Sequence, residues 1–243
     1  MFSFLDSDEA ALYIWLVKFE ACKTLVLGED DAAAHQLASL GIPLGVLEDA
    51  ARVGEFARDN CSTYHPLSFR GTASWADTIR ALAESLVGLG WTRQDPSGLP
   101  LLVSPDGSNA ISVQLGDELT AHRHALPRTK YPKGDATREA VRANSSLPLP
   151  GMEYLMPKEK FKVLSRQYSV WFFLRHRIEG SDRVKLELSK PRDLTDGGIA
   201  DDWSLRIILG NVPLSPEPPI SRRAPLHGGD AAEEQIDVPV TRK

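Results

Sequence analysis

A helical stripe of apolar residues gives way to strand-like alternation in the central third of the chain, and the remaining sequence is arranged around that change. Five apolar side chains recur at steps of one, three or four, which places them on one face of a helix over residues 72–87. Thr72 or Ser74 is expected to cap its first turn, and Gly88 and Gly90 supply the permissive backbone that ends it. The stripe consists of Trp75, Ile79, Leu82, Leu86 and Val87.

A hairpin and a second, short helix follow. Residues 101–103 and 111–115 are apolar or alternate between apolar and polar, and Pro105-Asp106-Gly107 between them predicts a tight reversal. Asp135 is expected to cap a helix over residues 136–143. The order is therefore helix, hairpin, loop and helix.

Helices are expected before this central stretch and strands after it. The front of the chain repeats apolar residues at helical spacing, whereas the back alternates apolar and polar residues between turn sequences, as in an antiparallel meander. The expected helices cover residues 6–17, 30–40 and 46–58, and the expected strands cover residues 168–178, 184–189, 203–209 and 236–240.

These patterns predict an α+β fold with an N-terminal helical cluster, a central helix–hairpin–helix block and a C-terminal antiparallel β meander. A chain of 243 residues has room for one large domain or two small ones. Proline and glycine make residues 147–151 the best boundary. We expect an acidic helical region at 1–60 packed on the core, a central α/β block at 61–147, and a β-rich region at 152–243 with a Pro-rich tail.

Charge is distributed unevenly along the chain, although the net charge is only −5. Residues 1–60 contain eleven Asp or Glu against four Lys or Arg, whereas residues 121–180 contain twelve Lys or Arg against five Asp or Glu. Such asymmetry indicates a binding face, or two parts of one molecule that complement each other. Overall acidity disfavours a general nucleic-acid binder, and the local basic surface keeps that option open.

The sequence predicts a cytoplasmic protein without a membrane partner. No apolar run reaches the length that crosses a bilayer, and residues 1–6 lack the basic start of an export signal. Two cysteines, Cys22 and Cys61, do not make a disulfide framework.

A basic loop and a basic run are the candidate binding residues. The loop precedes Gly134 and the start of a helix, so side chains and free amides together could bind an anion, although the nucleotide-loop pattern Gly-x-x-x-x-Gly-Lys-Ser/Thr is absent. The competing interpretation is a rigid turn with solvated or paired lysines. Aromatic residues in 168–173 add the composition of a single-strand nucleic-acid face, but their alternation favours burial in the core. The candidates are Arg128, Lys130, Lys133, Lys158, Lys160, Lys162 and Arg166.

A metal site is a further hypothesis. His122 and His124 would point to one face of an extended segment, and His65 with Cys61 could complete four ligands. The competing interpretation is two histidines in a polar loop and a cysteine that packs as a small apolar residue. Diagnostic zinc spacings are absent, as are the Gly-x-Ser-x-Gly and Gly-x-Gly-x-x-Gly patterns, so we predict no cofactor and lean away from an enzyme.

The run Thr-Lys-Tyr-Pro-Lys-Gly-Asp-Ala-Thr at 129–137 and the Ala-Val-x-x-Asn at 140–144 resemble an uncharacterised bacterial family associated with plasmids, phages and integrated elements. The resemblance covers the central third of the chain and carries no known catalytic residues. It implies an accessory protein of a mobile element.

Three functions follow as hypotheses. The first, which we favour, is a non-catalytic interaction protein that binds a protein complex, related to bacterial defence or anti-defence, through charge-segregated faces. The second is a nucleic-acid-binding accessory protein that uses the basic 128–177 surface. The third is a metal-dependent enzyme at His65, His122 and His124. The sequence leaves the partner and the oligomeric state open.

Overall fold

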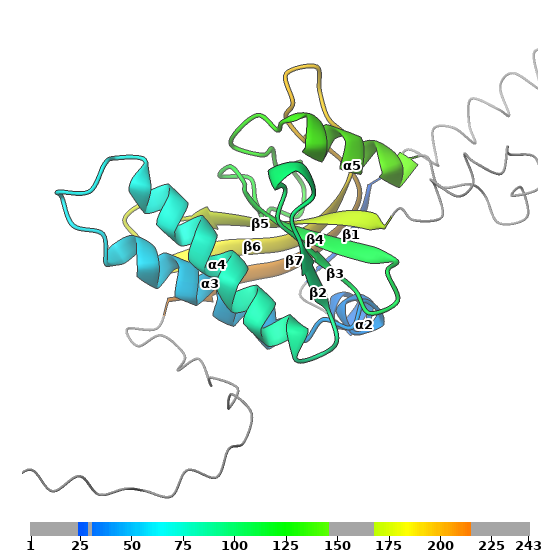
Figure 1. Cartoon of the computed structure of the whole chain (residues 1–243), viewed down its shortest axis with the longest axis horizontal. Coiled ribbons are helices and arrows are strands. Elements are labelled where there is room, and N and C mark those ends of the chain that lie inside the picture. The colour runs from blue at the N-terminus through cyan, green and yellow to red at the C-terminus, as the bar shows by residue number, and fades with distance from the viewer. Residues whose placement is uncertain (1–23, 29–30, 146–167, 215–243) are drawn as a thin grey trace, which may run out of the picture.

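In the computed structural model, which describes residues 24–28, 31–145 and 168–214, a mixed sheet of seven strands runs through the molecule (Figure 1). Helices α2, α3 and α4 cover one face of the sheet and α5 covers the other. The elements are β1 (Leu25–Leu27), α2 (Asp31–Ser39), α3 (Leu44–Asp59), α4 (Phe69–Val87), β2 (Thr92–Gln94), a 3-10 turn (Pro96–Gly98), β3 (Leu101–Val103), β4 (Asn109–Leu115), α5 (Asp135–Ser145), β5 (Ser169–Arg177), β6 (Arg183–Asp193) and β7 (Asp202–Pro213).

Two antiparallel meanders make up most of this sheet, whose strand order is β1-β7-β6-β5-β4-β3-β2. Strands β2, β3 and β4 form one meander, and β5, β6 and β7 form the other. They meet where β4 pairs in parallel with β5, with Ile111 opposite Trp171 and Leu115 opposite Arg175. Parallel pairing requires a long return of the chain, and α5 lies on that return.

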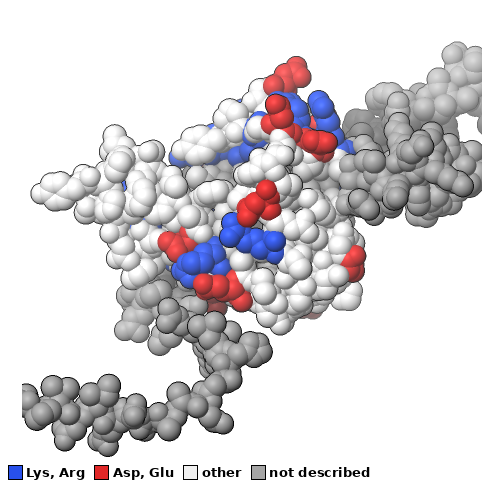
Figure 2. Space-filling model, in the orientation of Figure 1, with Lys and Arg blue, Asp and Glu red and all other residues white. Residues whose placement is uncertain are grey.

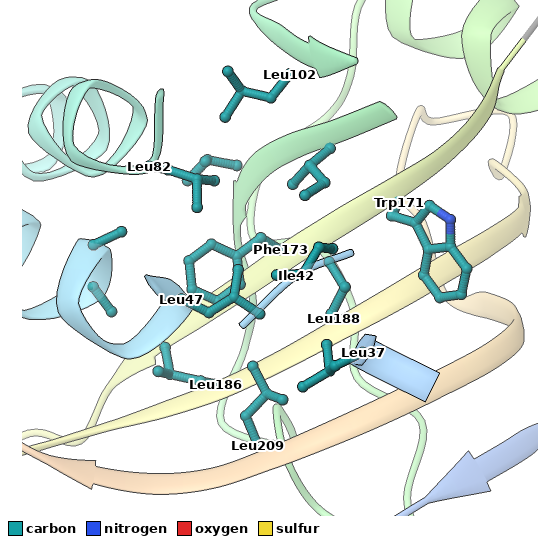
Figure 3. Close-up of a cluster of buried hydrophobic side chains, with 14 of the residues drawn as sticks. Leu37, Ile42, Leu47, Leu82, Leu102, Trp171, Phe173, Leu186, Leu188 and Leu209 are labelled. Carbon is teal, nitrogen blue, oxygen red and sulfur yellow. The ribbon is translucent and has the colours of Figure 1, made fainter. Parts of the chain in front are cut away.

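The larger core lies between the sheet and helices α2, α3 and α4 (Figure 3). Leu47 of α3 and Leu82 of α4 contact this core together with Phe173 of β5, and all three are fully buried. Full burial of a leucine or phenylalanine side chain stabilises the fold by about 1.5–3 kcal/mol. A smaller core on the opposite face contains Val141 of α5, Phe172 and Trp203.

Strand β5 is buried on both faces over Ser169–Arg175. The aromatic residues of that run are therefore core, as their alternation favours, and they do not form an exposed face for single-stranded nucleic acid. Phe172 contacts Trp203 edge-on, with ring centroids 6.2 Å apart, in the core beneath α5.

The mixed α+β class is confirmed. The predicted arrangement is met in part: β3 pairs antiparallel with β4, and β5, β6 and β7 pair antiparallel in order, but they belong to one mixed sheet that also contains β1 and β2. The predicted cap of the central helix is wrong. Helix α4 begins at Phe69, with Ser68 at the N-cap position and no side-chain cap hydrogen bond. Thr72 Oγ1 donates instead to Ser68 O, and the buried Ser74 donates to Glu55 of α3. The backbone before the apolar stripe continues the helix by one turn, so both candidate caps lie inside it.

Two edge strands, β1 and β2, are missing from the sequence-based prediction. Each is three residues long, too short to show a period of two. The front of the chain is consequently not helical throughout, because β1 pairs in parallel with β7, Leu25 opposite Leu205. The three predicted regions contribute strands to one sheet, and the division of the chain at residues 60 and 147 stays a prediction. The expected helix 6–17, the boundary 147–151, the Pro-rich tail beyond residue 214 and the strand 236–240 lie outside the described residues.

Candidate anion-binding pocket

A basic cavity of about 550 Å³ lies where the C-terminal ends of α3 and β5 meet the first turn of α4. Five cationic residues and three acidic residues line it, so the lining residues have an excess of two positive formal charges. The cationic residues are Arg58, Arg70, Lys130, Arg175 and Arg177, and the acidic residues are Asp59, Glu179 and Asp182.

Arg175 of β5 contributes to this lining, and its side chain is fully buried, so the guanidinium lies behind the surface of the cavity. Its guanidinium Nη1 donates to Ser74 Oγ at 3.2 Å and lies 3.6 Å from Glu55 Oε1. Its Nε and Nη2 have no hydrogen-bond acceptor within the part of the chain that the structure describes. Buried donors without a partner are rare in native proteins, and each raises the question of what accepts it. Burial lowers the pKa of Arg175 to about 10, so the group remains cationic at neutral pH.

Gly54 of α3 allows this arrangement. A Cβ atom at this position would lie 1.9 Å from Thr78 Oγ1, 2.6 Å from Ser74 O and 2.9 Å from Arg175 Nη1. Only a residue without a side chain lets α3 approach α4 so closely above the guanidinium. Glycine at position 54 therefore allows the close approach of α3 to α4 beside the Arg175 guanidinium.

A single buried carboxylate, Glu55, serves two guanidinium groups. Glu55 Oε1 accepts from Ser74 Oγ at 3.1 Å, and Oε2 accepts from Arg177 Nη1 at 3.2 Å. Arg177 also donates to Asp59 at 3.1 Å, so its charge is met by two carboxylates. The Arg175 charge is met less completely, because it has only the longer contact to Glu55.

Backbone hydrogen bonds at the ends of β4 and β5 position Lys130 beside the cavity. Gly116 N donates to Arg175 O, and the chain then returns so that Lys130 N donates to Leu115 O at 2.8 Å and Thr129 bridges Gly116. The basic loop thus lies against the end of β4, beside the end of β5.

The other two residues of the predicted basic loop lie elsewhere. Lys133 lines an adjoining cavity of about 430 Å³, and burial lowers its pKa to about 8. Arg128 is exposed, and its Nε lies 3.6 Å from Asp201 Oδ2. Of the loop candidates, only Lys130 belongs to the basic cavity. Lys158, Lys160, Lys162 and Arg166 lie outside the described residues.

A buried ion pair fixes the loop that leads to Lys130. Glu187 of β6 accepts from Arg206 of β7 and also from Ala121 N, at 2.7 Å to the latter. Arg206 donates further to His122 O and Ala125 O. The Glu187 carboxylate and the Arg206 guanidinium therefore attach residues 121–125 to strands β6 and β7.

The residues considered for a metal do not come together. His65 lies in the exposed α3–α4 connection, where its ring stacks on Phe69 and its Nδ1 bonds Ser62. Cys61 donates to Ala57 O in the same connection. The rings of His122 and His124 contact each other edge-on in a different loop, and their centroids are 6.5 Å apart. Across residues 24–28, 31–145 and 168–214, no three His, Cys, Asp or Glu side chains are placed to bind a metal ion.

Sequence reasoning missed Arg58, Arg70 and Glu55 as site residues. Arg58 and Arg70 stand at opposite helix ends and converge only because α3 packs against α4. The available signal was Arg175 itself, a guanidinium inside the apolar run Trp-Phe-Phe-Leu-Arg. A charged residue in such a run is rarely buried without a partner.

Comparison of the chain with protein-family models, curated proteins and solved structures finds no match. Within the described ranges, no helix is long and apolar enough to cross a membrane.

Proposed function

We propose that the chain is a non-catalytic binding protein that binds an anionic group of a partner protein in the basic cavity. The observation that carries the proposal is the buried Arg175 guanidinium, which has two nitrogen atoms without an acceptor among the described residues. Guanidinium groups donate strong, directional hydrogen bonds to carboxylates and phosphates. Arg58 and Lys130 lie nearer to solvent in the same lining and add the charge that attracts such a group.

Three carboxylates in the cavity disfavour nucleic acid as the ligand. A polyanionic backbone would meet Asp59, Glu179 and Asp182 together with the cations, and these acids repel successive phosphates. On the face shown in Figure 2, Lys and Arg side chains stand beside Asp and Glu side chains, without a continuous basic stripe. Mixed charge of this kind fits one compact anionic group of a protein better than a strand of phosphates.

The biological setting is part of the same proposal. The resemblance of residues 129–144 to an uncharacterised bacterial family associated with plasmids, phages and integrated elements supports a partner from a bacterial defence or element-maintenance complex.

The test is a pull-down from bacterial lysate with the tagged full chain, with and without nuclease. We expect a protein retained by the natural chain, in equal yield after nuclease, and lost with the double variant Arg58→Ala/Lys130→Glu. The matched control is Arg93→Glu, because Arg93 is exposed on edge strand β2 and pairs only with Asp95 among the described residues. Partner binding that survives the double variant overturns the assignment of the cavity, and a yield that collapses with nuclease assigns the basic surface to nucleic acid.

A direct measurement follows the guanidinium itself. Nitrogen-15 spectra of the chain, titrated with sodium acetate against sodium chloride at matched ionic strength, should show the Arg175 Nε–H resonance moving with acetate. The same titration of Arg58→Ala/Lys130→Glu should give a much smaller shift. No acetate-specific shift in the natural chain contradicts the proposed function.

A further inference from the structure

The adjoining cavity of about 430 Å³, which Lys133 lines, is here called the second cavity, and it shares a wall with the basic cavity. Leu115 lines both. Arg70 and Lys130 line the basic one, and the next residue of each, Gly71 and Tyr131, lines the other. The first turn of α4, the end of β4 and the basic loop therefore separate two openings that lie side by side.

The second cavity differs from the first in chemistry. Trp75, Leu115 and Tyr131 supply its apolar surface, and Lys133 is its only charged lining residue within the described part of the chain. Trp75 is half-buried and fixed, because its indole Nε1 donates to Val113 O at 3.1 Å. A fixed aromatic wall beside open volume favours an apolar group.

We propose that the two cavities form one bipartite site for a carboxylate and an adjacent apolar side chain of a partner polypeptide. The carboxylate lies in the basic cavity and the apolar side chain lies against Trp75. This inference rests on the proposed function and specifies the chemistry of the bound group.

The charge of the basic cavity favours a carboxylate over a phosphate. An excess of two positive charges, with Glu55 already beside Arg175, matches a monoanion. A phosphate at neutral pH carries about −1.5 to −2 charges and would face the three acidic lining residues at the same time. The planar guanidinium of Arg175 also matches the two oxygens of a carboxylate.

The rim favours a polypeptide over a small free acid. Arg58 and Arg70 stand at the two ends of the α3–α4 connection, and that connection carries Tyr64 and Leu67, which are 97% and 99% exposed. Large apolar side chains this exposed are available for contact with residues that flank the bound pair. A small acid confined to the cavities would leave them in water.

Gly71 provides a clean way to close the apolar half. A Cβ atom at Gly71 would meet no atom within 4 Å, and its backbone is ordinary helix, so Gly71→Leu introduces bulk beside Trp75 without a clash in the fold. Gly45 of α3 is the matched control, because its Cβ also meets nothing within 4 Å and it lines neither cavity. Both variants replace a helical glycine by leucine, which removes helix propensity as a difference.

The experiment measures binding of short peptides to the full chain by calorimetry. The probes are acetyl-Gly-Gly-Phe and acetyl-Gly-Gly-Gly with free carboxylates, acetyl-Gly-Gly-Phe amide, acetyl-Glu-Phe-Gly amide, sodium acetate and inorganic phosphate. We expect the free Phe peptide to bind at least about tenfold more tightly than the Gly peptide. Gly71→Leu should remove that advantage and leave acetate binding unchanged, whereas Gly45→Leu should preserve both.

Every other outcome of the peptide-binding experiment either supports or overturns a stated part of the proposal. Equal affinity for the Phe and Gly peptides, or inorganic phosphate bound more tightly than acetate, overturns the bipartite site while the proposed anion binding stands. Absence of binding by acetate and by phosphate overturns the proposed function itself. Tighter binding of the Phe peptide amide than of the free acid also overturns the carboxylate. Tight binding of the internal Glu-Phe amide supports the site and identifies a side chain as the source of the carboxylate.

Discussion

Arg206 and Glu187 form a fork of two hydrogen bonds inside the sheet, with Nε 3.2 Å from Oε1 and Nη2 2.6 Å from Oε2. Both side chains are fully buried. Glu187 also accepts from Ser189 Oγ and Ala121 N, and Arg206 also donates to two loop carbonyls, so the pair is hydrogen-bonded on every side. The connection between β4 and the basic loop depends on this pair.

Glu187→Gln is expected to destabilise the protein by about 3–5 kcal/mol, because it leaves a buried guanidinium without its counter-charge. The measurement is the free energy of unfolding in urea. Hydrogen exchange at the Ala121 amide should accelerate more than exchange in α4, since that amide loses its carboxylate acceptor.

Arg80→Ala is the matched control. Arg80 donates to Asp77 and Glu84 on the exposed face of α4, and pairs of this kind contribute less than about 1 kcal/mol. Equal losses in the two variants would show that burial does not set the energy of the Arg206–Glu187 pair.

Gly54→Ala is expected to destabilise the protein by about 2–3 kcal/mol, because the added methyl would lie 1.9 Å from Thr78 Oγ1 and 2.6 Å from backbone Ser74 O. The gain in helix propensity, about 1 kcal/mol, does not offset a clash with backbone. Gly71→Ala should instead stabilise by about 0.5–1 kcal/mol, since its methyl meets open space. The measurement is the free energy of unfolding in urea of the Gly54→Ala and Gly71→Ala variants. A Gly54→Ala variant more stable than the natural chain would contradict the close approach of α3 and α4.

Lys133 should titrate near pH 8, because burial lowers the pKa of its ammonium group. Labelling with an amine-specific reagent, read by mass spectrometry, should show Lys133 modification rising with a midpoint near pH 8. An unperturbed lysine has a pKa of about 10.4. The unfolded chain binds more protons than the folded chain between these values, so this group makes stability rise with pH from about 8 to about 10.4. Lys133→Met should remove its part of that rise, and a labelling midpoint near 10 would contradict the burial.

Asp106 should titrate near pH 2, because hydrogen bonds from Ser104 Oγ and from the Ser108 hydroxyl and amide favour its charged form. The folded pKa is depressed, so the turn's contribution to stability is complete above the ordinary value of about 3.9 and disappears as pH falls through about 2. Carbon-13 spectra of the Asp106 carboxyl measure this midpoint. Ser104→Ala should raise it, whereas Ser39→Ala, in α2, should not.

The sequence predicts local elements well because their signals are local. The stripe on α4 and the turn at residues 105–107 each lie within one short stretch. Ile79, Leu82 and Leu86 are buried as expected and the turn stands where expected, whereas Val87 at the end of the stripe is exposed. The parallel pairing of β4 with β5 has no such signal. It joins Ile111 to Trp171 across the return that contains α5, and only tertiary packing specifies it.

The candidate site likewise contains residues that the sequence predicts and residues that only tertiary packing brings in. The sequence predicts Lys130 as a binding residue because the basic loop is visible as a run of positive charge. Arg175 follows four apolar residues and resembles the end of a core strand, which it is. The parallel register brings the two together, so no reading of either segment alone could have placed them in one cavity.

The pairing of β1 with β7 has a consequence for synthesis on the ribosome. Thr24 Oγ1 donates to Trp203 O, a contact between residues 179 positions apart. At about 5–20 residues per second, β1 waits about 9–36 s after translation before its partner strand exists. The backbone groups of β1 that later pair with β7 have only water as a hydrogen-bond partner from that strand's side during the interval. Completion of this edge is therefore a late event in the life of the nascent chain.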